Sequence, residues 1–290
     1  METPVQKPIS ELSEALEALG TDKLLIQTAN GTKIIQASIL APALLSLLVG
    51  DSAASHNAIY RGKYLGSSFT SAQSAAIRSG KFTDLYIGDY WTINGRNWRL
   101  GAFDYWYRCG DTDCTTHHAL IVPDAHLYTA AMNPTNTTEG AYIGSQMYKT
   151  GLDEAKTIIN AAFGSDHILT HREYFNNAIS NGKPSGGSWY DSTVDLMTEN
   201  MVYGGRQFSS LPEGADPWSS CHNYTIDKSQ LPLFRYAPWF IHAQRAYWCW
   251  LRDVVSATTF AGFAYAGSSG NCDYYGASNV GGVRPAFAIY

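Results

Sequence analysis

Charged residues are scarce in this chain of 290 residues, since Asp, Glu, Lys and Arg together make up 16% of it. A typical soluble domain carries about 25%. The 25 acidic residues outnumber the 20 basic residues and give a net charge of −5. This balance excludes a large basic face for nucleic acid. The apolar content of 45% excludes intrinsic disorder, which requires low hydrophobicity and high net charge.

An export signal and a long apolar segment are also lacking. Residues 1–20 are acidic and polar, whereas a signal peptide begins with basic residues and continues with an apolar stretch. The longest apolar run, from Ile39 to Val49, contains Pro42 and Ser46. It is far shorter than the roughly 20 residues that span a bilayer. We therefore expect no membrane insertion and expect the chain to be made in the cytoplasm of its host.

Motifs of the common hydrolases and nucleotide-binding enzymes are absent from the sequence. There is no H-E-x-x-H, no G-x-S-x-G and no phosphate-binding glycine-rich loop. His171-Arg-Glu173 has the H-x-E spacing of zinc deaminases, but the P-C-x-x-C partner of that motif is missing. We predict that the protein is not an enzyme, with no catalytic residue and no cofactor.

Cysteines are few and scattered: Cys109, Cys114, Cys221, Cys249 and Cys272. Their odd number and wide spacing argue against a disulfide framework and favour buried thiols. Cys109, Cys114 and His117 are close enough in sequence to hold zinc, which thiolates and imidazoles ligate. We predict no metal site, because a second matched pair of ligands is not evident, and leave metal binding by these three residues open. Calcium, bound by several carboxylates, is a weaker alternative at Asp104, Asp111 and Asp113.

Aromatic residues are abundant, with 19 Tyr, 11 Phe and 8 Trp. Tyr and Trp give a binding surface a large contact area at low entropic cost. The same residues favour strands, so composition leaves a binding surface and a β-rich core equally open.

The order of local patterns predicts an α+β protein in two parts. Residues 1–55 contain an expected helix over 8–20, a hairpin over 23–37 that turns at Asn30-Gly31, and a helix over 38–48. We predict that this helix-hairpin-helix unit anchors or oligomerises the chain, since so small a unit buries little surface alone. In residues 56–290 we expect a hairpin that turns at Asn94-Gly95, a strand at 118–122, and helices near 71–79, 125–132, 153–163, 172–179 and 192–201.

The C-terminal segment carries two motifs, Tyr247-Trp-Cys-Trp-Leu-Arg-Asp253 and Gly282-Val-Arg-Pro-Ala-Phe287. A Trp-Leu-Arg strand, a permissive loop region and a closing Gly-Val-Arg-Pro strand resemble the C-type-lectin-like domain of the formylglycine-generating-enzyme type. The middle of the chain is similar to phage structural proteins, on the segments Leu85–Trp91, Gly110–His118 and Thr170–Tyr174. The resemblance, with the N-terminal hairpin unit included, covers nearly the whole chain.

The resemblance implies a bacteriophage virion protein, similar to phage tropism determinants, in which residues 56–290 form the lectin-like domain with helical insertions. It also implies a homotrimer, bound through the N-terminal unit to other virion structural proteins. The segment Ser256–Val280 uses only small, aromatic and a few polar residue types. All of them can arise by changes at the adenines of an Asn codon. Diversification of these loops by a retroelement and a tight meander of ordinary origin both remain open.

We predict that the C-terminal loops display aromatic faces and hydrogen-bonding groups to a ligand of the bacterial cell surface, a glycan in preference to a protein. The predicted ligand-binding residues are Phe260, Phe263, Tyr265, Asn271, Asp273, Tyr274 and Tyr275. Trp250, Leu251 and Val283 are expected in the core, and Arg252 and Arg284 as buried anchors, because each lies in an apolar strand.

Two alternative functions stay open. In the first, the protein is a structural head fibre or a decoration of the capsid or tail, and its loops bind nothing. In the second, it is an enzyme that degrades envelope polysaccharide. Such enzymes use paired carboxylates about 5–10 Å apart. The candidate carboxylates are Asp104, Asp191, Asp195 and Glu199.

Overall fold

A computed structural model of the chain describes residues 23–28, 31–36, 40, 44, 48, 50–175, 178–180, 183–185, 187–208, 230–241, 248–263 and 270–290. Contacts within the chain divide it into two compact units, Met1–Gly50 and Asp51–Tyr290. The sequence prediction placed this boundary after residue 55, inside the helix α2 (Ala53–Asn57). The helix α2 packs on a strand of the larger unit. Residues 53–55, at the start of α2, therefore belong to the larger unit.

The N-terminal unit contains an antiparallel hairpin of β1 (Lys23–Thr28) and β2 (Gly31–Gln36). Gly31 has a φ of +104°, a conformation that glycine adopts without steric cost. The predicted hairpin is therefore confirmed. Residues 40, 44 and 48 are helical, within the range where a helix was expected. The helix expected over residues 8–20 lies outside the described residues, and a helix-hairpin-helix unit stays a prediction.

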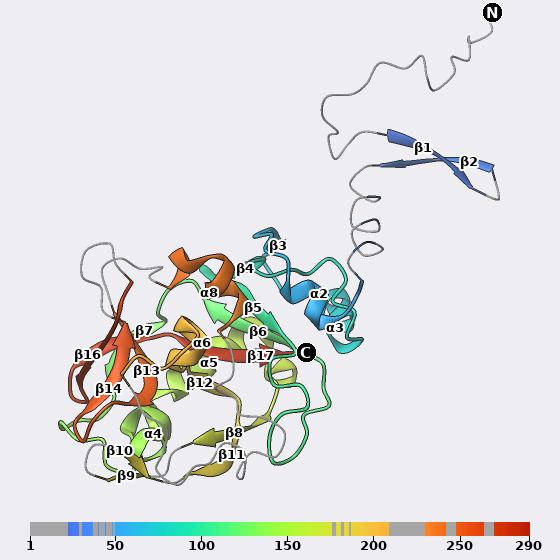
Figure 1. The fold of residues 1–290 in the computed structure, drawn as a ribbon. Coiled ribbons are helices and arrows are strands. Elements are labelled where there is room, and N and C mark those ends of the chain that lie inside the picture. Colours follow the sequence, from blue (N-terminus) through green and yellow to red (C-terminus); the bar gives the residue numbers. More distant parts are fainter. Residues whose placement is uncertain are drawn as a thin grey trace, which may run out of the picture. The chain divides into compact units, whose positions relative to one another are not determined.

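The larger unit is built around a six-stranded sheet, whose strands lie in the order β12-β17-β6-β5-β4-β3. The bounds are β3 Tyr64–Gly66, β4 Tyr90–Ile93, β5 Arg96–Phe103, β6 Ala119–Pro123, β12 Val194–Leu196 and β17 Pro285–Ile289. β17, the last strand of the chain, pairs with β12 on one side and β6 on the other (Figure 1). The C-terminal motif therefore closes the sheet in its interior.

A second sheet has five strands in the order β15-β14-β13-β16-β7. The bounds are β7 Tyr128–Ala131, β13 Cys249–Val254, β14 Thr259–Phe263, β15 Cys272–Gly276 and β16 Val280–Val283. β13 and β16 run parallel, whereas the other pairs are antiparallel. Among the described residues, β15 is an edge strand of this sheet, and β14 is the strand that pairs with it.

Short helices and two small ladders complete the unit. The α-helices after α2 are α3 Ser71–Arg78, α4 Ala141–Gly144, α5 Asp153–Phe163, α6 Glu199–Tyr203 and α8 Pro232–Tyr236, with a π-helical turn at Met147–Gly151 and 3₁₀ turns at Ser165–His167 and Pro238–Phe240. The ladders pair β8 (His171–Phe175) with β11 (Ser188–Ser192), and β9 (Ala178–Ser180) with β10 (Lys183–Ser185). In the described part of the chain, no helix has the length and hydropathy needed to cross a bilayer.

Aromatic side chains fill the core between α5 and the six-stranded sheet. Trp98 of β5, Phe163 of α5 and Phe287 of β17 meet edge to face, with ring centroids 5.5–5.7 Å apart. Trp98 and Phe287 have no exposed surface and Phe163 has 4%. Burial of each such ring stabilises the fold by roughly 3 kcal/mol, so this cluster fixes the last strand against the middle of the chain.

The C-terminal residues expected in the core are there. Trp250, Leu251 and Val283 are fully buried, and the buried-anchor prediction for Arg252 and Arg284 is confirmed, with 7% and 2% exposed. The Arg284 guanidinium donates to three carbonyl oxygens, those of Pro123, Phe240 and Ile241, at 2.8, 2.8 and 3.2 Å. It thereby ties β17 and β16 to the segment that follows α8.

Three expected helices are wrong. Residues 128–131 of the expected helix 125–132 form β7, which pairs with β16. The expected helix 172–179 is replaced by β8 and β9, and only the end of 192–201 is helical, in α6. The α+β class is confirmed. The finer assignment to a C-type-lectin-like domain stays a prediction.

Candidate functional site

Two predicted site residues, Tyr274 and Tyr275, lie exposed on the edge strand β15. Their exposed fractions are 45% and 37%. Each ring is backed by a second ring: Phe208 meets Tyr274 edge to face at 5.0 Å, and Trp248 stacks on Tyr275 at 4.7 Å. The side chains of adjacent strand residues point to opposite faces, so the two pairs occupy the two sides of β15. We call these four residues the β15 aromatic pairs.

The Trp248 ring packs closely against the backbone of β16. A Cβ at Gly281 would lie 2.4 Å from the Trp248 ring, so only glycine allows this approach. The ring also meets Trp250 edge to face at 4.4 Å, and the indole N–H of Trp250 donates to the Ala130 carbonyl at 3.0 Å. Trp248 is therefore held by three strands and gives Tyr275 a rigid support.

Phe208 is held by the buried carboxylate of Glu199 in α6. The two carboxylate oxygens accept the backbone N–H groups of Gln207 and Phe208, at 3.2 and 3.1 Å. The Cys272 thiol of β15 donates to the same carboxylate at 3.4 Å. Burial and the Glu199 carboxylate both raise the pKa of the Cys272 thiol. The thiol stays protonated and serves as a donor that ties β15 to the Phe208 segment.

The remaining predicted site residues fall into three groups. Asn271 is exposed, and Asp273 is half-buried and accepts the Tyr274 N–H at 2.9 Å. Phe260 is fully buried, because its side chain packs in the core beside Trp250; its ring does not reach the surface. The backbone of Phe263 lies in β14, but its side chain and the whole of Tyr265 lie outside the described residues.

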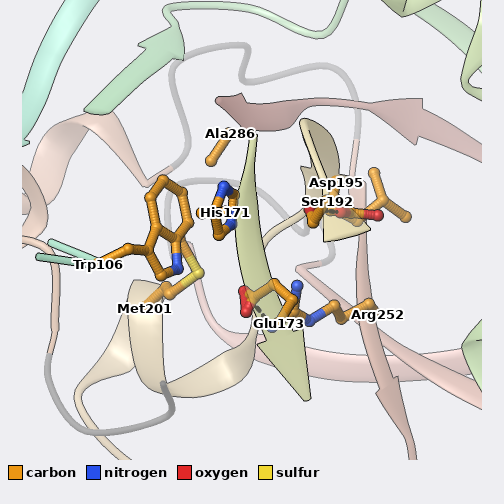
Figure 2. Close-up of a pocket in the computed structure, with 9 residues that line it drawn as sticks. Trp106, His171, Glu173, Ser192, Asp195, Met201, Arg252 and Ala286 are labelled. Atoms are coloured by element: carbon orange, nitrogen blue, oxygen red, sulfur yellow. Dashed lines mark hydrogen bonds and ion pairs between the residues drawn. The ribbon is translucent and has the colours of Figure 1, made fainter. Parts of the chain in front are cut away.

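A second cluster of polar side chains surrounds a small cavity between β8, β12 and β13 (Figure 2). Arg252 donates to Glu173 at 2.9 Å, and both side chains are buried. Asp195 accepts hydrogen bonds from the hydroxyls of Ser192 and Tyr142, the latter at 3.0 Å. We call this the His171 cavity, after the residue whose ring stacks on Trp106 at 3.8 Å.

Burial sets the protonation of this cluster. It lowers the pKa of His171 well below 6.5, and the nearby positive charge of Arg252 lowers it further. It raises the pKa of Asp195, against the lowering effect of Arg252. The cavity has a volume of about 10 Å³, which is room for one water molecule. Its size supports a structural role in joining β8 to β13.

The carboxylates considered for glycoside cleavage have separate partners. Asp104 bonds to His117 at 2.7 Å, Asp191 to Arg172 at 3.0 Å, Asp195 to Tyr142 and Glu199 to Cys272. Asp195, Asp191 and Asp104 line three different cavities.

Cys109, Cys114, Cys249 and Cys272 are thiols that form no disulfide with one another. Cys221 lies outside the described residues. Within the described ranges, no group of three or more His, Cys, Asp or Glu side chains is placed to hold a metal ion.

Phe208 and Trp248 are functional candidates that the sequence did not indicate. Phe208 is far from β15 along the chain, and no local pattern marks it as the support of Tyr274. Trp248 lies within the motif that carries the lectin-like resemblance, but nothing in the sequence shows that its ring faces Tyr275.

Comparison with known proteins gives no relative: no protein-family model, curated protein or solved structure matches the chain.

Proposed function

We propose that the chain is an adhesin of a bacteriophage particle, a fibre or tail-tip protein that presents β15 to a ligand on the bacterial surface. The observation that carries the proposal is that Tyr274 and Tyr275 are exposed and each is braced by a second ring. A braced aromatic ring loses little conformational freedom when it binds. Its exposed face suits the apolar face of a sugar, and a glycan is therefore the proposed ligand.

The proposal includes the fold of the larger unit, as a C-type-lectin-like domain with helical insertions. The motifs that carry this resemblance form β13, β16 and β17, which are buried and join the two sheets. β15 lies at the edge of the five-stranded sheet that contains β13 and β16. A rigid frame that carries a variable edge is the arrangement expected of a display domain.

The N-terminal unit, in this proposal, attaches the protein to the virion and brings three copies together. An isolated two-stranded hairpin is marginally stable in water. Ile34, Leu44 and Leu48 are exposed by 65%, 47% and 84%. Leu44 and Leu48 are one helical turn apart and share a face. Packing of copies along these residues removes apolar surface from water, and three linked sites bind more tightly through effective concentration.

Adhesion to bacterial cells tests the proposal. The full chain, labelled with a fluorophore, is incubated with a panel of bacterial strains beside the double variant Tyr274→Ala/Tyr275→Ala. We expect at least one strain to bind the wild-type protein and the double variant to lose about tenfold or more in affinity, since two aromatic contacts are removed.

The matched control is Tyr64→Ala, which removes a tyrosine that is 50% exposed on β3 of the other sheet. This variant should bind as the wild type does. Equal loss in Tyr64→Ala and the double variant would refute the assignment of the site to β15. A protein found on purified particles by immunogold labelling that binds no strain would favour the structural head-fibre alternative.

A further inference from the structure

The helices α2 and α8 both pack against β5 (Figure 1), and residues of all three elements line a separate open pocket. Its volume is about 250 Å³, just below the range of roughly 300–1,000 Å³ for small-molecule sites. The lining includes Asn57, Phe103, Asp104, Tyr105, Tyr107 and Arg235. None of these residues belongs to the β15 aromatic pairs or to the His171 cavity.

The walls of this α2–α8 pocket are fixed by hydrogen bonds. The Asn57 amide donates to the Phe103 carbonyl at 2.9 Å and accepts the Phe103 N–H at 2.7 Å. One Asp104 oxygen bonds to the His117 ring at 2.7 Å, and the other accepts the His118 N–H at 3.0 Å. A ligand therefore meets polar groups that are already in position, and binding costs little reorganisation.

One residue that lines this pocket, Arg235, carries a positive charge. Arg235 is exposed, and its guanidinium lies over the Tyr236 ring at 5.7 Å. No ion pair joins Arg235 to a carboxylate among the residues that the structure describes. Asp104, the acidic group of the wall, is already engaged by His117 and His118.

We propose that the α2–α8 pocket binds a small anionic ligand that also carries hydroxyl groups. Arg235 pairs with the acid group, because guanidinium matches carboxylate and phosphate through two parallel hydrogen bonds. Asp104 accepts a ligand hydroxyl, since an ionised carboxylate has about four lone-pair positions and only two are used. The rings of Tyr105 and Tyr107 flank the ligand.

The volume of the pocket fits one sugar-sized unit. A uronic acid and a glycerol phosphate unit present the same chemistry, an acid group beside hydroxyls, and both occur as components of bacterial surface polymers. The pocket is a binding site additional to β15, and its assignment does not depend on the proposed function.

Titration of the full-length protein with D-glucuronate and with glycerol 1-phosphate, followed by saturation-transfer NMR, tests this site. D-glucose is the neutral control for glucuronate. We expect at least one of the two anions to bind in the millimolar range and glucose to bind at least about tenfold more weakly, since it lacks the charged hydrogen bonds. The anion that binds identifies the source of the acid group.

The variant Arg235→Ala should weaken binding of that anion by about tenfold. Its control is Arg78→Ala, which removes another exposed arginine that lies over a tyrosine ring, that of Tyr290, at 4.7 Å. Arg78→Ala and Tyr274→Ala/Tyr275→Ala should both bind the anion as the wild type does. Failure of both anions to bind the wild type, glucose binding equal to glucuronate binding, or equal loss in Arg235→Ala and Arg78→Ala would overturn the proposal.

Discussion

Two buried histidines, His118 and His171, are held uncharged by the fold. Both side chains are buried, and burial lowers the pKa of each below the usual 6.5. In the unfolded chain both rings regain the usual pKa and take up protons near pH 6.5. The folded protein does not bind these protons over the same range. Acidification therefore favours the unfolded state.

The free energy of unfolding should thus be highest above pH 6.5 and should fall as the pH drops below it. The slope should approach a limit of about 1.4 kcal/mol per pH unit for each histidine well below pH 6.5, and be about half of that near pH 6.5. Asp195 acts in the opposite direction at lower pH, since its pKa is raised above 3.8 and the folded state binds the extra proton. Urea unfolding between about pH 7.5 and about pH 5.5 measures the slope. It should decrease in His171→Leu; an unchanged slope in that variant would contradict the account of His171.

At the scale of elements, the contact between β16 and Trp248 requires glycine at position 281. Gly281→Ala places a Cβ 2.4 Å from the Trp248 ring, so the ring must shift, and its stacking on Tyr275 changes. We expect this variant to lose about 1–3 kcal/mol of unfolding free energy, the usual cost of overpacking. We also expect weaker ligand binding at β15. Urea unfolding and the cell-adhesion assay measure the two effects.

The control for this variant is Gly205→Ala, because the nearest atom to a Cβ there, on Gln207, is 4.0 Å away. Gly205→Ala should leave both stability and adhesion unchanged. If Gly281→Ala retains wild-type stability and adhesion, Trp248 is not the support that the geometry of β16 indicates.

Elements with strong local signals could be predicted from the sequence. Asn94 and Gly95 both have positive φ, 52° and 73°, as a tight hairpin turn between β4 and β5 requires. Thr70 and Gln73 cap α3 reciprocally, a pattern that defines a helix start within four residues. These elements depend on neighbours in sequence, so their prediction needed no knowledge of the fold.

Elements that depend on distant partners could not be predicted in the same way. Residues 128–131 contain two alanines, which favour helix. These four residues instead pair with β16, which lies more than 140 residues further along the chain. The same reason explains the site. Tyr274 and Tyr275 were predicted from the residue types of the C-terminal segment and from the family resemblance, whereas Phe208 and Trp248 are placed by tertiary contacts that leave no local pattern.

At the scale of the whole molecule, the chain divides into Met1–Gly50 and Asp51–Tyr290, and the proposed function assigns attachment to the first unit and display to the second. Light scattering on the full chain and on a version that lacks residues 1–50 tests this. We expect a trimer for the full chain and a monomer for the truncated one, because the exposed apolar residues Ile34, Leu44 and Leu48 are removed. A monomer in both cases would contradict assembly through this unit and would remove the contribution of avidity.

The central claim is that Tyr274 and Tyr275 contact the surface ligand. Its most direct test is NMR of the protein labelled with ¹³C at the tyrosine rings, titrated with the purified surface polysaccharide of an adhering strain. We predict that the ring signals of Tyr274 and Tyr275 shift on binding, while that of Tyr64 does not. Binding of the polysaccharide with shifts confined to tyrosines outside β15 would contradict the account.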